Sequence, residues 1–129
     1  MMNDRFKFRA FHKPTSKMYE VYSFDKDFIQ ATESLVVPSI KTLKNDDCVL
    51  EQCTGLKDKN GKLIYEGDIV KHYALLEKNN KVLVCLFKNG CFRFDNTNDT
   101  PFNFAYSVNP VEIIGNIHEN PELLEQNDE

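Results

Sequence analysis

The sequence VLVCLFKNGCFRF, residues 82–94, carries the clearest local signal for the fold. Two runs of β-forming residues flank Asn89-Gly90, the preferred dipeptide of a two-residue type I′ turn, because both central positions of that turn need φ > 0. The turn sets the register of the two runs, which pairs Lys88 with Cys91, Phe87 with Phe92, Leu86 with Arg93 and Cys85 with Phe94. The stretch therefore predicts an antiparallel β-hairpin.

Successive side chains of a strand point to opposite faces, so this register divides the hairpin into two sides. Burial of a Phe ring contributes roughly 1.5–3 kcal/mol, so a one-residue slip that exposed the rings would be costly. We expect a core side made of Leu83, Cys85, Phe87, Phe92 and Phe94, and an outer side made of Leu86, Lys88, Cys91 and Arg93.

Residues 5–24 predict a second hairpin, with Phe6, Phe8 and Ala10 on its buried face and Lys7 and Arg9 on its solvent face. Residues 25–47 have no clean period and contain Pro38, so we expect short strands and a loop there. Further strands are expected at 49–56, 63–65, 69–70, 102–106 and 111–114.

A helix of one or two turns is expected after these strands, with Asn120 as its N-cap and Pro121 at its first position. The elements together predict a mainly β fold of short, coiled antiparallel sheets, partly barrel-like, with a short C-terminal helix. A length of 129 residues fits a single domain, 1–129, in which 118–129 form an acidic, partly helical tail.

Composition and charge argue against several classes of protein. No run approaches the roughly 18 apolar residues of a membrane span, and the start MMNDRFKFRAF lacks the apolar core of a signal peptide. Residues 101–129 contain no Lys or Arg, whereas nucleic-acid binders usually carry a clustered basic stripe. We expect a cytoplasmic protein with no membrane partner, for which nucleic acid is an unlikely partner.

The groups that could support catalysis or metal binding are scattered. Neither Cys48 with Cys53 nor Cys85 with Cys91 has C-x-x-C spacing. We expect four reduced, structural cysteines, with no metal, no cofactor and no catalytic residue, although a dyad of Cys85 with His72 remains an alternative. The chain has three histidines, His12, His72 and His118, and no two of them are close in sequence.

The polar segment around Asp58-Lys59-Asn60-Gly61 lacks the ligand spacing of a calcium loop. Asp68 could serve as a general base, but we expect it to bind neighbouring backbone N–H groups in an Asx-type turn. Glu66 and Asp68 could form a carboxylate pair, and we expect solvated surface acids instead.

Three segments of the chain, in this order, resemble the YopX family of small proteins of phages and bacterial prophages. They are KFRAF at 7–11, TGLKDKNGKLIYEGDIV at 54–70 and VEIIGNIHENPELL at 111–124. Phe11 stands where relatives typically have Trp, and residues 25–47 match nothing. The resemblance implies a mainly β fold of bifurcated and coiled sheets, a phage-related origin and a tendency to self-associate. It implies no activity and no catalytic residue.

We therefore expect a non-enzymatic phage or prophage accessory protein, in the cytoplasm of the bacterial host, that acts through protein–protein contact. Its first expected partner is itself, as a homo-oligomer, and other phage or host proteins are further candidates. An aromatic content of 12% favours interfaces, because so small a domain cannot bury all of that surface. The structural motif residues are Gly55, Asn60, Gly61, Gly67, Asp68, Asn89, Gly90 and Gly115.

The alternative is a small β-barrel-like module that binds nucleic acid. Basic side chains near a hairpin tip could contact phosphates, and aromatic rings could stack on bases. The candidate residues are Lys57, Lys59, Lys62, Phe92 and Phe94, with Tyr106 as a further stacking ring.

Overall fold

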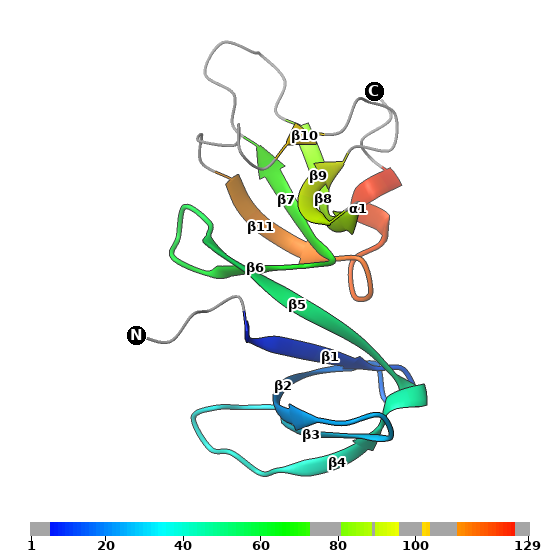
Figure 1. Ribbon diagram of the computed structural model, residues 1–129. Coiled ribbons are helices and arrows are strands. Elements are labelled where there is room, and N and C mark those ends of the chain that lie inside the picture. Colours follow the sequence, from blue (N-terminus) through cyan, green and yellow to red (C-terminus); the bar gives the residue numbers. More distant parts are fainter. Residues whose placement is uncertain (1–5, 73–80, 89, 96–101, 104–110, 126–129) are drawn as a thin grey trace. The chain divides into compact units, whose positions relative to one another are not determined.

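The computed structural model describes residues 6–72, 81–88, 90–95, 102–103 and 111–125. The described strands form two antiparallel sheets, and one short helix follows them (Figure 1). The elements are β1 (Phe8–His12), β2 (Lys17–Phe24), β3 (Phe28–Thr32), β4 (Lys41–Lys44), the 3₁₀ turn η2 (Asn45–Asp47), β5 (Cys48–Lys57), β6 (Leu63–Tyr65), β7 (Asp68–His72), β8 (Lys81–Lys88), β9 (Cys91–Asp95), β10 (Phe102–Asn103), β11 (Val111–Asn116) and α1 (Glu122–Glu125).

The six-stranded sheet has the order β4-β3-β2-β1-β5-β6, and the five-stranded sheet has the order β10-β9-β8-β7-β11. The predicted mainly β fold with a short C-terminal helix is confirmed. Both strand orders are linear, so within the described residues neither sheet closes into a barrel, and the partly barrel-like character that we expected is not found.

The chain divides into two compact units, residues 1–53 and 54–129, and strand β5 runs from the first into the second. The expected single domain stays a prediction. The first unit has its own core, which consists of Ala10, Tyr19, Ile29, Ala31 and Leu43 with Val21, Cys48 and Leu50 packed against it.

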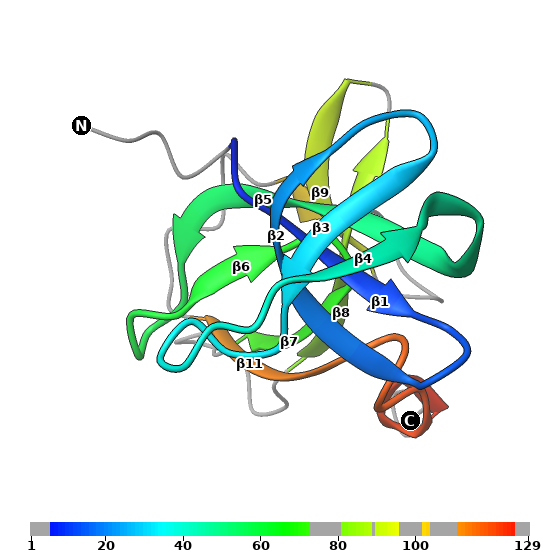
Figure 2. The same ribbon diagram turned by 90° about the horizontal axis from the view of Figure 1, so that it is seen from below.

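In the first unit the predicted hairpin of residues 5–24 is confirmed as β1 and β2, with Ala10 opposite Tyr19. Strands β3 and β4 form a further hairpin inside the region expected to hold short strands and a loop. The loop that joins them, residues 33–40, lies at the opposite end of β3 and β4 from the β2–β3 turn (Figure 2).

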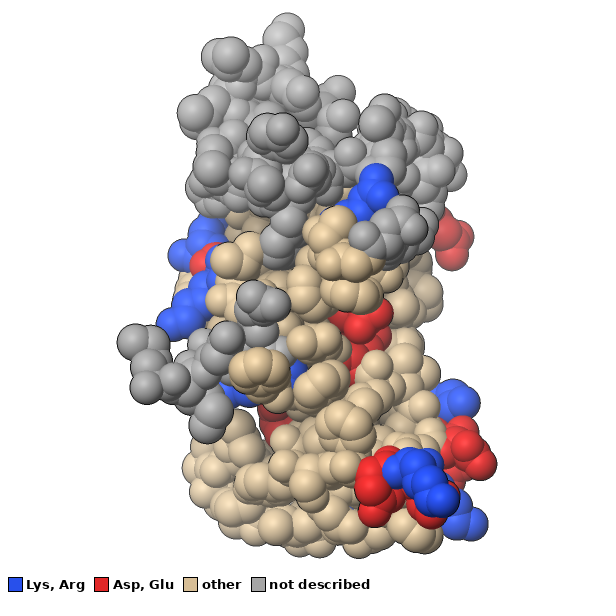
Figure 3. All heavy atoms as spheres, in the orientation of Figure 1, with Lys and Arg blue, Asp and Glu red and all other residues tan. Residues whose placement is uncertain are grey.

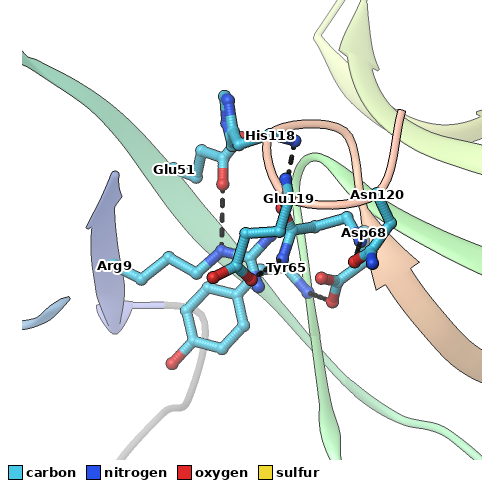
Figure 4. Close-up of polar contacts among 8 residues, drawn as sticks. Arg9, Glu51, Tyr65, Asp68, His118, Glu119 and Asn120 are labelled. Carbon is cyan, nitrogen blue, oxygen red and sulfur yellow. Dashed lines mark hydrogen bonds and ion pairs between the residues drawn. The ribbon is translucent and has the colours of Figure 1, made fainter. Parts of the chain in front are cut away.

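The predicted faces of β1 are wrong at two positions. Phe6 precedes the strand and is 73% exposed, whereas Arg9 is buried. Arg9 lies opposite Glu51 of β5, and its Nε donates to the Glu51 carboxylate at 2.9 Å (Figure 4). The two side chains share one face of the sheet, both residues are buried, and a buried charge persists only when it is paired.

The second unit contains the hairpin of residues 82–94, and its predicted register is confirmed at all four pairs. Leu83, Cys85 and Phe94 are buried as expected. Phe87, however, is 47% exposed, and Phe92 is only partly buried. The paired region between β7 and β8 ends at Val84, so the tip of the hairpin extends beyond its neighbouring strand. Gly90 has φ +83°, and Asn89 lies outside the described residues.

Strand β11 forms the edge of the five-stranded sheet and pairs with β7, with a bulge between Ile113 and Gly115. The expected strand at 102–106 is described only at Phe102–Asn103. Within the described residues no helix is long and apolar enough to cross a membrane.

Candidate interaction surface

The most exposed aliphatic side chains of the described chain lie together in one loop. Residues 33–40 join β3 to β4, and we call them the aliphatic loop. Val36 is 89% exposed, and the other three large apolar side chains of the loop are at least 60% exposed: Leu35, Val37 and Ile40. On the face of β1–β4 that Figure 3 shows, uncharged side chains cover most of the surface and the charged ones gather at one end. Contiguous apolar exposure of this kind marks contact surfaces.

Two hydroxyl groups give the aliphatic loop its shape. Thr32 is buried, and its Oγ1 donates to the Ser34 carbonyl at 3.0 Å and accepts from the Ser39 N–H at 3.1 Å. The Ser34 Oγ in turn accepts from the Val36 N–H at 3.1 Å. Because these bonds satisfy the backbone from inside, the apolar side chains are left to face solvent.

A small charged group borders the loop where β4 begins. The Glu33 carboxylate lies 3.4 Å from the Lys17 ammonium and 3.7 Å from that of Lys41. All three side chains are about half exposed, so each pair contributes little to stability. This group supplies both signs of charge beside the apolar surface.

The opposite end of β3 and β4 is acidic and aromatic. The carboxylate of Asp25 accepts from the Phe28 and Asp27 N–H groups, which lower the pKa of Asp25. Tyr22, Phe24 and Phe28 are each about half exposed there. The ring of Phe24 is also in edge contact with Phe8, at 5.1 Å between centroids.

In the second unit, the carboxylate of Asp58 organises the loop between β5 and β6. It accepts from the N–H groups of Asn60 at 2.8 Å, Lys62 at 2.9 Å and Ile113 at 3.1 Å. Burial raises the pKa of Asp58, but the hydrogen bonds from Ile113, Lys62 and Asn60 and the charge of Lys62 outweigh it, so the pKa lies below its ordinary value. Asp58 is therefore a structural acceptor rather than a cation ligand.

Asp68 is buried, and its Oδ2 accepts from the Tyr65 N–H at 2.8 Å (Figure 4). This is the backbone-binding role that we expected for it. Asp68 is not the solvated surface acid that we also expected, because it is buried at the first position of β7. The positive-φ glycines of the predicted motif are Gly55, Gly61, Gly67 and Gly90.

A polar turn that the sequence did not reveal follows β11. The Asn116 Oδ1 accepts from the N–H groups of His118 and Glu119, and its Nδ2 donates to the Glu119 carboxylate at 2.7 Å (Figure 4). The Asn120 side chain accepts from the Asn116 N–H at 3.2 Å, so it faces β11 rather than capping the helix as we predicted. A Cβ on Gly115 would lie 2.5 Å from the Asn120 Oδ1, which explains the glycine there.

The residues proposed for nucleic-acid contact do not gather into a stacking platform. Phe94 is fully buried in the core, and Phe92 packs against the same core. Lys57 and Lys62 are exposed, and the Lys59 ammonium lies 4.0 Å from the Glu112 carboxylate. Stacking on a base would require Phe94 to leave the core. Tyr106 lies outside the described residues.

The cysteines and histidines stay dispersed. All four cysteines are free thiols, with Cys53 and Cys85 buried, Cys48 half-buried and Cys91 exposed, so Cys91 is not the buried small side chain that we expected. Burial and the charge of Asp47 raise the pKa of the Cys48 thiol, against a smaller opposite effect of Lys13. Among the described residues, no three His, Cys, Asp or Glu side chains group as metal ligands.

Residues 7–125 match the family described as YopX protein. The chain belongs to the YopX family. Its fold is similar to that of protein EF1440 from Enterococcus faecalis, with a TM-score of 0.63 and 29% identity over 92% of this chain and 96% of that one. It is also similar to protein yopX from Bacillus subtilis, with a TM-score of 0.61 and 21% identity over 95% of this chain and 97% of that one. No curated protein matches the YopX-family chain significantly.

Proposed function

We propose that this YopX-family chain is a non-enzymatic phage or prophage accessory protein of the host cytoplasm that works by protein–protein contact, with a second copy of itself as the first partner. The observation that carries the proposal is the aliphatic loop, whose four large apolar side chains are exposed while its backbone is held in place.

An ordered apolar loop is well suited to association. Full burial of one such side chain stabilises a complex by roughly 1.5–3 kcal/mol. Loops that become ordered only on binding lose part of this gain, whereas Thr32 and Ser34 already hold this loop.

The charges beside the loop favour a second copy over an unrelated partner. A two-fold interface brings the same patch together twice, so the patch must complement itself. Glu33 and Lys41 supply both signs side by side, so the charged border of the loop does not repel a copy of itself.

Size-exclusion chromatography with light scattering over a range of concentrations tests the proposal. We expect an oligomer for the wild type and a shift toward the monomer for Val36→Glu, because a charge would enter the apolar contact surface. Phe87→Ser is the control, since it removes a half-exposed apolar ring of the other unit. A monomeric wild type at high concentration, or equal masses for wild type and Val36→Glu, would contradict self-association through this loop.

A further inference from the structure

Strand β4 is the outer strand of the six-stranded sheet, and one hydrogen bond shows which of its backbone groups face β3. The Asn45 N–H donates to the Asp27 carbonyl at 3.0 Å, toward β3. Inward and outward backbone groups alternate along an antiparallel strand. The N–H and C=O groups of Lys41 and Leu43 therefore face β3. Both groups of Thr42 and the N–H of Lys44 face away from the sheet, whereas the Lys44 carbonyl begins the η2 turn.

Nothing in the described part of the chain covers that outer side. The contacts of Thr42 are its pairing with β3 and a side-chain bond to Gln30 at 2.8 Å, and no described group bonds the outward N–H groups of Thr42 and Lys44 or the outward carbonyl of Thr42. The Lys44 carbonyl accepts the first hydrogen bond of the η2 turn. An uncovered row of this kind is a template for another strand. The first unit therefore presents two free backbone donors and one free acceptor directly after the aliphatic loop.

We propose that the outer edge of β4 pairs antiparallel with β4 of a second copy, so that the two sheets join through this strand. This inference rests on the proposed self-association and identifies the strand through which it occurs. Centred on Leu43, the pairing sets Thr42 of one copy opposite Lys44 of the other. Both outward residues then pair within the limits of the strand. The Lys44 N–H of each copy donates to the Thr42 carbonyl of the other, so two backbone hydrogen bonds form across the two-fold axis.

The alternative two-fold registers are less favourable. Centring on Lys44 places the two Lys44 ammonium groups directly opposite each other, and like charges in that position destabilise a sheet. Centring on Thr42 leaves Lys44 opposite Ile40, outside the bounds of β4. The Leu43-centred register avoids both problems.

Charge supports the antiparallel arrangement. At the start of β4, Lys17 and Lys41 outweigh Glu33 by one positive charge. The end of β4 lies beside the β2–β3 turn and the η2 turn, where four acids outweigh three lysines by one negative charge: Asp25, Asp27, Asp46 and Asp47 against Lys13, Lys26 and Lys44. Antiparallel pairing sets the positive end of one copy against the negative end of the other.

The apolar surfaces agree with the same arrangement. The aliphatic loop precedes β4. Phe28, whose ring is half exposed, lies opposite Lys44 at the other end of the strand. The two-fold pairing brings the aliphatic loop of one copy toward the aromatic end of the other. The same geometry thus accounts for two exposed apolar surfaces of the first unit.

Lys44→Pro tests the inference, with Lys44→Gln as the matched control. Lys44 has φ −82°, close to the value that proline requires, and its N–H is not used within the sheet. Proline removes one intermolecular hydrogen bond per copy, which should weaken the dimer roughly 10- to 100-fold. Glutamine removes only the charge and should leave dimerisation within a few-fold of the wild type.

Hydrogen exchange of the wild type tests the same pairing independently, because it measures the protection of single amides of β4. The amide of Lys44 should gain protection as concentration rises, while those of Lys41 and Leu43 stay protected throughout. If Lys44→Pro self-associates like the wild type and the wild-type Lys44 amide exchanges equally at all concentrations, the β4 pairing is wrong and the proposed self-association stands. A wild type that remains monomeric refutes both. Retained protection of the Leu43 amide verifies that Lys44→Pro is folded.

Discussion

The outer strands β11 and β4 differ in whether other groups of the chain bond to the backbone along their outer edges. At β11, the Lys59 N–H donates to the Val111 carbonyl at 2.9 Å, and the Asp58 carboxylate accepts from the Ile113 N–H. A loop of the same chain thus closes that edge. At β4, no described group bonds the outward N–H groups of Thr42 and Lys44 or the Thr42 carbonyl. The chain itself closes one edge, whereas we propose that a second copy closes the other.

The loop that closes β11 belongs to the long central segment, residues 54–70, on which the family resemblance rests. Exposed edges invite unwanted pairing, and natural sheets cover or charge them. The central segment therefore has a structural role, because it places one carboxylate where it satisfies both its own loop and a distant strand.

The largest expected effect comes from opening the closed edge with Asp58→Ala. Three backbone N–H groups lose a charged acceptor, and we expect the free energy of unfolding to fall by about 2–4 kcal/mol. Urea denaturation measures the change, and Asp46→Ala, in the exposed η2 position, serves as the control. A loss no larger than that of Asp46→Ala would show that the loop does not stabilise β11.

Gly115→Ala disturbs the same strand from its other end. The added methyl group would lie 2.5–2.8 Å from atoms of the Asn120 side chain, and such overpacking costs about 1–3 kcal/mol. Thermal unfolding measures the loss. In an Asn120→Ala background the cost should shrink, since the clashing atoms are gone. Equal costs in both backgrounds would rule out the clash as the cause.

Thr32→Val tests the hydroxyl group that holds the aliphatic loop beside the open edge of β4. The substitution keeps the shape of the side chain and removes the hydroxyl that bonds Ser34 and Ser39, so we expect a loss of about 1–2 kcal/mol. Amide exchange in the aliphatic loop should accelerate, and self-association should weaken because the loop must then be ordered on binding. Unchanged exchange in residues 33–40 would contradict this role.

The smallest effect is the pH dependence of the closed edge. The pKa of Asp58 is lower in the folded chain than in the unfolded one, so its stabilising effect is present above the ordinary carboxyl pKa. That effect is lost as the pH falls through the lowered value. The difference in unfolding free energy between wild type and Asp58→Asn should therefore narrow below about pH 4. A constant difference down to about pH 2 would contradict the shift.

Local patterns predicted the elements that depend on local chemistry. Asn89-Gly90 and the flanking β-formers were sufficient for the register from Cys85–Phe94 to Lys88–Cys91. Arg9 was placed in solvent, because alternation alone does not reveal that Glu51 of the distant strand β5 would lie opposite it and pair with it. Phe87 was placed in the core, because the sequence does not show where the neighbouring strand ends.

The aliphatic loop was missed for a related reason. Leu35, Val36 and Val37 form a short apolar run before Pro38, and such a run in a sequence is usually a buried strand. Thr32 and Ser34 turn it outward by hydrogen bonds that depend on the hairpin around them. The small polar residues next to the run were the available signal.

The sequence by itself determined the β class, the hairpin of residues 82–94 and the family, because turn chemistry and alternation act between near neighbours. Only the tertiary structure decided which edge is closed, which charges are buried and which apolar side chains face outward. Those properties depend on groups far apart in the chain, such as Asp58 and Ile113, and only folding brings them into contact.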